Sequence, residues 1–172
     1  MIHKIQNFVK SKKQIKCTTS ENVGAVEDEL GIKIPILLRN CLTKIGNGGF
    51  GPGYGLVGVG EEGYQSDFGD LRSTYYQIQK DKNLVGESWP KSMLPFCEWG
   101  NAMFSCVNCE NGQVNLLMNF KLYEQDLTLS DFFSSWIAGQ VDSLLKTDAL
   151  ITTKIIRNPF TGGNAEASGH LD

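Results

Sequence analysis

A run of glycines between residues 47 and 60 most restricts what this chain can fold into. Asn47-Gly48-Gly49 opens the run, and further glycines follow at 51, 53, 55, 58 and 60. Glycine gives up more backbone freedom in a helix than any other residue, so such a run ends any helix before it. The residues between the glycines favour extended chain: Phe50, Tyr54, Leu56, Val57 and Val59. The chain is therefore predicted to change here from helices to a sheet.

Three helices are predicted before the glycine run. Residues 2–13 carry apolar side chains at helical spacing with lysines between them, which indicates an amphipathic helix with a basic polar face. Ser20 is placed to cap a second helix, which Gly31 would end. Pro35 suits the start of a third helix, which would end at Gly46.

The second half of the chain predicts a sheet and a covering helix. A helix is expected over residues 71–82, and strands over 94–99, 102–108 and 114–119, with a turn at Glu110-Asn111-Gly112. Ser130 is placed to cap a last helix, whose apolar stripe runs from Phe132 to Leu145. These patterns predict a single α+β domain over residues 1–157, followed by a loose tail at 158–172. It would have N-terminal helices, a curved, mainly antiparallel meander sheet and a C-terminal amphipathic helix packed on that sheet.

The cysteines and the apolar segments indicate a protein of a reducing compartment. The chain has 172 residues, no apolar run long enough to cross a bilayer and no signal-peptide core at its N-terminus, so we expect it in the cytoplasm. Its five cysteines are an odd number, which argues against a disulfide framework. Cys106 and Cys109 form a C-x-x-C pair that could hold zinc with Cys97, but no fourth ligand is evident. Half-buried thiols without a metal or redox role are favoured.

No catalytic motif stands out, and no cofactor is expected. Gly53 to Gly58 matches the dinucleotide pattern G-x-G-x-x-G, but the match follows a helix where the motif requires a strand. The two histidines, His3 and His170, lie near the chain ends, which removes the commonest general base. The sequence therefore favours a binding protein over an enzyme.

The charge distribution favours a basic protein partner. Residues 1–16 hold five lysines and no acid, so the rest of the chain is more acidic than the net charge of −3 suggests. An acidic body repels nucleic acid, and no membrane partner is expected. The candidate partner-binding residues combine acids with aromatic rings: Glu61, Glu62, Tyr64, Asp67, Asp70 and Tyr76. The alternative is that the rings belong to the core and the acids only face water.

Four stretches, in the same order along the chain, resemble the SUKH superfamily of SMI/KNR-type proteins. Glu27 to Pro35 resembles the family's opening E-x-x-L-G-x-x-L-P, with Ile34 where leucine is usual, and Leu42 to Gly55 resembles its turn N-G-G-x-G-P-x-x-G. Residues 94–107 are similar to its central strands, and Ser130 to Gly139 to its closing helix. The basic helix at 2–13 lies outside the resemblance. The matching positions, expected to be structural, are Leu30, Gly31, Pro35, Asn47, Gly48, Gly49, Trp99, Gly100 and Trp136.

The resemblance implies a function that composition does not reveal. Bacterial members of the superfamily are immunity proteins that bind and neutralise a cognate toxin domain, often a nuclease or deaminase, and fungal relatives act as interaction hubs. The expectation is a non-catalytic immunity protein with a cationic toxin domain as its partner. The alternative is a general scaffold module without a toxin partner, whose basic N-terminal helix docks to a membrane or to an acidic protein. The sequence leaves the oligomeric state open.

Overall fold

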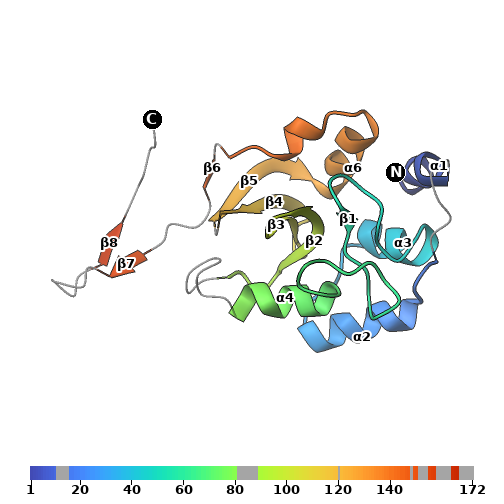
Figure 1. Cartoon of the computed structure of the whole chain (residues 1–172), viewed down its shortest axis with the longest axis horizontal. Coiled ribbons are helices and arrows are strands. Elements are labelled where there is room, and N and C mark those ends of the chain that lie inside the picture. The colour runs from blue at the N-terminus through green and yellow to red at the C-terminus, as the bar shows by residue number, and fades with distance from the viewer. Residues whose placement is uncertain are drawn as a thin grey trace.

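The computed structural model confirms the predicted α+β architecture (Figure 1). It describes residues 1–10, 16–80, 89–119, 121–147, 149–150, 155–157 and 164–166. Its helices are α1 (Ile2–Lys10), α2 (Ser20–Leu30), α3 (Ile36–Lys44), α4 (Leu71–Lys80) and α6 (Leu129–Ile137), with a 3₁₀ turn, η1 (Val141–Leu144). Helices α1, α2 and α3 lie together at one end of the sheet, and α4 and α6 lie on opposite sides of it (Figure 1).

The sheet is antiparallel throughout, with the strand order β1-β2-β3-β4-β5-β6. The predicted meander is formed by the long strands β2 (Met93–Gly100), β3 (Met103–Asn108), β4 (Gln113–Met118) and β5 (Lys121–Thr128). The short strands β1 (Gly55–Leu56) and β6 (Ala149–Leu150) occupy the two edges. Strand β5 was not among the predicted strands, because its residues are mostly polar and its buried positions, Leu122 and Gln125, do not follow the two-residue period of a strand.

A further short ladder pairs β7 (Ile155–Arg157) with β8 (Asn164–Glu166). This ladder crosses the boundary predicted between the domain and its tail at residue 157. The other positions of 158–172 lie outside the described residues, as do residues 11–13 of the predicted basic helix.

Helix α6 closes the core from above the sheet in Figure 1. Phe132 and Phe133 are completely buried, and the Phe132 ring meets the ring of Phe96 from β2 edge to face, with centroids 5.1 Å apart. Such aromatic pairs add to the free energy gained by burying the rings. The helix ends at Ile137, so the prediction that it continues to Leu145 was wrong. Gly139, with φ of 74°, follows the helix and redirects the chain into η1.

Helix α1 is part of the same core. Ile5 and Val9 are buried, and the ring of Phe8 meets the ring of Trp136 edge to face at 5.0 Å. The apolar stripe of this basic helix is thus covered by α3 and α6. Its lysines at positions 4 and 10 face solvent.

Two predicted helix caps are each displaced by one or two residues. Thr19, one residue before Ser20, caps α2 by accepting a hydrogen bond from Asn22 N. Thr128, two residues before Ser130, caps α6 and forms a reciprocal capping box with Asp131. In both cases a threonine upstream offers the same hydroxyl acceptor as the predicted serine, and the chain begins its helix there.

A buried carboxylate fastens α2 to α3. Glu27, 6% exposed, accepts hydrogen bonds from Ile34 N at 3.1 Å and from Arg39 Nη1 at 2.9 Å. The chain can return to Glu27 because Gly31 adopts φ of 66°, which ends α2, and Pro35 begins α3. The predicted roles of Gly31 and Pro35 are therefore confirmed. The stretch Glu27 to Pro35, which matches the motif E-x-x-L-G-x-x-L-P, therefore forms the end of α2, the turn after it and the residue before α3.

We expect Glu27→Gln to lower the free energy of unfolding by about 2 kcal/mol, because it leaves a partly buried Arg39 without its counter-charge. Asp28→Asn is the matched control, since it removes the same charge from the next position, where the carboxylate is 81% exposed and its ion pair with Lys33 is weak. That control should change stability by less than about 1 kcal/mol. Urea denaturation of the two variants measures the difference, and equal losses would contradict the role given to Glu27.

Candidate functional site

Asn47 fixes the loops that carry the predicted binding residues. Its side-chain Nδ2 donates to Val59 O and its Oδ1 accepts from Val59 N, both at 2.8 Å. Its backbone N–H donates to Lys16 O, and its carbonyl accepts from Tyr64 N. Val59 and Tyr64 therefore lie in one loop that is hydrogen-bonded to the side chain and the backbone of the buried residue Asn47.

Gly48 allows two backbone segments to pass in contact. It adopts φ of 81°, and a Cβ at this position would lie 2.5 Å from Leu56 O and 2.7 Å from Gly58 N. Both atoms belong to the main chain, so neither can move aside cheaply. The predicted structural role of the Asn47-Gly48-Gly49 turn is thus explained by the close approach of the strand that follows it.

A second buried carboxylate, Glu98 of β2, anchors the loop from the sheet side. Glu98 is 1% exposed and accepts hydrogen bonds from the Tyr64 hydroxyl and from Asp67 N, both at 2.9 Å. Burial, followed by the hydrogen bond to Glu98, raises the pKa of Tyr64 to about 12. The Tyr64 hydroxyl is therefore a fixed donor to Glu98 at neutral pH.

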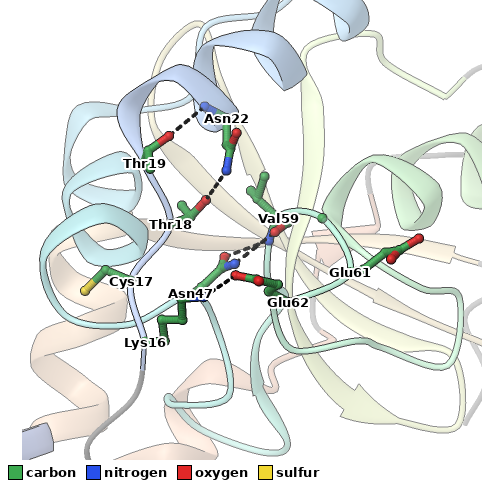
Figure 2. A pocket seen from close by; sticks show the side chains of 10 residues that line it. Lys16, Cys17, Thr18, Thr19, Asn22, Asn47, Val59, Glu61 and Glu62 are labelled. Carbon is green, nitrogen blue, oxygen red and sulfur yellow. Dashed lines mark hydrogen bonds and ion pairs between the residues drawn. The ribbon is translucent and has the colours of Figure 1, made fainter.

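Of the predicted binding residues, Glu61, Glu62 and Asp67 are exposed, and Tyr64 and Tyr76 are half-buried. Glu62 Oε2 lies 2.6 Å from Lys16 Nζ, and this bond, together with the lysine charge, lowers the pKa of Glu62. Figure 2 shows Glu61 pointing away from this pair along the same loop.

Asp70 differs from the other predicted binding residues in being buried, with only 5% of its surface exposed. Its Oδ1 accepts from Ser73 N at 2.9 Å and its Oδ2 from Gly60 N at 3.0 Å, so it caps the start of α4 and ties the loop to that helix. Burial acts to raise the pKa of Asp70, but the hydrogen bonds from Ser73 and Gly60 outweigh it and hold the pKa below 3.8. Sequence reasoning missed this capping role, although an acid directly before a helix is a common N-cap.

Tyr76 lies on α4 beside α2. Its hydroxyl is 3.5 Å from Glu29 O, and its ring meets that of Tyr75 edge to face. Arg72, one turn earlier on α4, donates to Glu29 Oε2 at 3.1 Å. These contacts join α4 to α2 at the surface.

Two hollows open where α2 meets the loop. The first, of about 300 Å³, is lined by Lys16, Cys17, Thr18, Thr19, Asn22, Asn47, Val59, Gly60, Glu61 and Glu62 (Figure 2). The second, of about 240 Å³, is lined by Asn22, Ala25, Val26, Glu29, Val59, Gly60, Asp70 and Arg72. Predicted binding residues thus occur in both.

The buried thiols are held in their protonated form. Burial raises the pKa of Cys106 strongly and that of Cys109 to about 12, which disfavours the thiolate that zinc binding or redox exchange needs. Within the described ranges, no three His, Cys, Asp or Glu side chains gather where they could hold a metal ion.

The remaining motif positions serve the fold. The indole N–H of Trp99 donates to Ser105 Oγ at 2.9 Å, and Gly100, with φ of 92°, leads into the β2–β3 turn. Trp99 and Trp136 are partly buried and pack against the core. Leu30 packs at the edge of the same core.

A model of the SMI1 / KNR4 family (SUKH-1) matches residues 17–138, most of the chain, and the chain therefore belongs to this family. The resemblance drawn from the sequence motifs is confirmed. A search of curated proteins finds no match. Among the described helices, none has the length and apolar character needed to span a membrane.

We expect Gly48→Ala to destabilise the fold by more than about 2 kcal/mol, because the added methyl group meets main-chain atoms at a positive φ. Gly24→Ala, within α2, is the control: nothing lies within 4 Å of its Cβ, so it should stabilise by about 0.5–1 kcal/mol. Thermal unfolding measures both variants: the unfolding temperature should fall for Gly48→Ala and rise for Gly24→Ala.

We expect Asp70→Ala to cost about 1–2 kcal/mol at neutral pH through loss of the cap. Because the folded state lowers the pKa of Asp70, its carboxylate contributes this stability above pH 3.8, and the contribution is lost as the pH falls through the lower folded-state value. The gap in unfolding free energy between wild type and variant should therefore narrow on acidification. A gap that does not change with pH would contradict this role.

Proposed function

We propose that this chain is a non-catalytic immunity protein that binds and neutralises a cognate toxin domain with a cationic surface. The observation that carries the proposal is its membership of the SMI1 / KNR4 family (SUKH-1) over residues 17–138. A nuclease or deaminase fits the partner best, because such enzymes present positive charge to nucleic acid.

The charge and the fixed path of the loop between Val59 and Asp70 support a binding role for it. Glu61 and Asp67 are exposed and make no ion pair within the described part of the chain. The loop that carries them is held by Asn47 at one side and by Glu98 at the other. A loop that is ordered before binding loses little conformational entropy on association, and its charge speeds encounter with a cationic partner.

The competing proposal is a scaffold module of the same family. In its membrane-docking form, α1 would have to release an apolar stripe that is covered by α3 and α6. The form in which α1 contacts an acidic protein needs only the exposed lysines of α1.

The test is co-expression of the full chain with the product of the gene immediately upstream. Cell survival together with co-purification of the two proteins is expected from an immunity protein. Failure of both would favour the scaffold proposal.

The double variant Glu61→Lys/Asp67→Lys should weaken binding of that toxin at least tenfold, about 1.4 kcal/mol, mainly through a slower association rate. Glu124→Lys/Asp142→Lys is the matched control, because it makes the same charge change at exposed positions on β5 and η1. Surface plasmon resonance at two salt concentrations measures both. Equal effects of the two double variants would exclude the loop as the binding face.

A further inference from the structure

The two hollows join into one groove between α2 and the loop. They are neighbours that share Asn22, Val59 and Gly60 in their linings, and the two hollows together are called the groove here. Val26 and Val59 line the groove and are each 5% exposed. The groove therefore combines an apolar base with charged walls.

Each half of the groove contains one ion pair at the surface. In the first half, Lys16 Nζ lies 2.6 Å from Glu62 Oε2, and in the second, Arg72 Nη1 lies 3.1 Å from Glu29 Oε2. The Glu62 and Glu29 side chains are 73% and 44% exposed. Exposed pairs contribute at most about 1 kcal/mol, so an incoming cation can replace the internal one at small cost.

We propose that this groove takes an extended, arginine-bearing segment of the partner, whose guanidinium groups replace Lys16 on Glu62 and Arg72 on Glu29. The inference rests on the proposed function and adds the chemistry of the contact. The planar guanidinium suits it, because it forms paired hydrogen bonds with a carboxylate while its stem lies on an apolar floor.

Charge complementarity favours a cation over an anion in this groove. Its walls carry the exposed acids Glu29, Glu61 and Glu62 against Lys16 and Arg72, apart from Asp70, which is buried as a helix cap. The N-terminus of α2 also borders the first half, but Thr19 already accepts from Asn22 N there. An anionic ligand would find that donor occupied and the acids opposed to it.

If the ligand displaces Lys16 and Arg72, substitutions of the cation and of the acid in each ion pair should have opposite effects on binding. If the ion pairs only hold the structure, the effects should have the same sign. If Lys16 competes with the ligand for Glu62, then Lys16→Ala should tighten binding while Glu62→Ala weakens it. If the pair served only to hold the loop, both variants would weaken binding. Arg72→Ala and Glu29→Ala repeat the comparison in the second half.

The control for net charge is Lys33→Ala. Lys33 is also exposed and paired with acids, Glu27 and Asp28, but it lines neither hollow. It changes the charge of the protein by the same amount as Lys16→Ala and should leave binding unchanged.

The experiment titrates the full chain with the peptide acetyl-Gly-Arg-Gly-Arg-Gly-amide, following backbone amide shifts by NMR. We expect the amide signals of Asn22, Gly60 and Arg72 to shift. Binding should be roughly two- to fivefold tighter for Lys16→Ala and weaker by a similar factor for Glu62→Ala. The citrulline analogue of the peptide should not bind. Absence of shifts, shifts away from the groove, equal binding of the citrulline peptide, or weaker binding by Lys16→Ala would each overturn the proposal.

This outcome is independent of the toxin experiment. Peptide binding without rescue in co-expression would keep the groove and remove the immunity function. Rescue by a toxin without peptide binding in the groove would keep the function and remove the groove as its site.

Discussion

The buried amide of Asn47 holds together three segments that are distant in sequence. Its N–H reaches Lys16, its side chain pairs with both backbone groups of Val59, and its carbonyl accepts from Tyr64. At 6% exposure these bonds face little competition from water, and each would leave a buried polar group unpaired if broken. Asn47 thereby holds Lys16 and Val59, which both line the first half of the groove, and Gly48 allows the strand that follows to pass close by.

Neighbouring acidic residues have different roles in this structure: the buried ones stabilise the fold, and the exposed ones face solvent or the groove. On α2, Glu27 points inward and holds α3, Asp28 faces water, and Glu29 stands at the groove. In the loop, Asp67 is exposed whereas Asp70 caps a helix. An acidic composition therefore overstates the charge available to a partner, since part of it is committed to the fold.

The sequence predicted the parts of the fold that depend on local rules. Gly31, Pro35 and the Asn47-Gly48-Gly49 turn were placed correctly, because chain reversal needs positive φ or a fixed φ at those positions. Strand β5 and the end of α6 were not, since the pairing of a mostly polar strand and the length of a helix are set by tertiary packing. The role of Glu98 depends on contacts with a loop more than thirty positions away. No alternation marked Glu98, because a bulge between Pro95 and Cys97 shifts the register and every position of β2 except Trp99 is buried.

The position of α1 has a consequence for how the chain acquires its structure. Phe8 leaves the ribosome well before Trp136, against which it packs, because Trp136 follows the last long strand of the meander in the chain. Contacts between such remote positions carry a large loop-closure entropy and slow folding. The part of the α1 stripe that α6 covers therefore lacks its partner through most of synthesis. During that interval the charge of the α1 lysines opposes association between nascent chains.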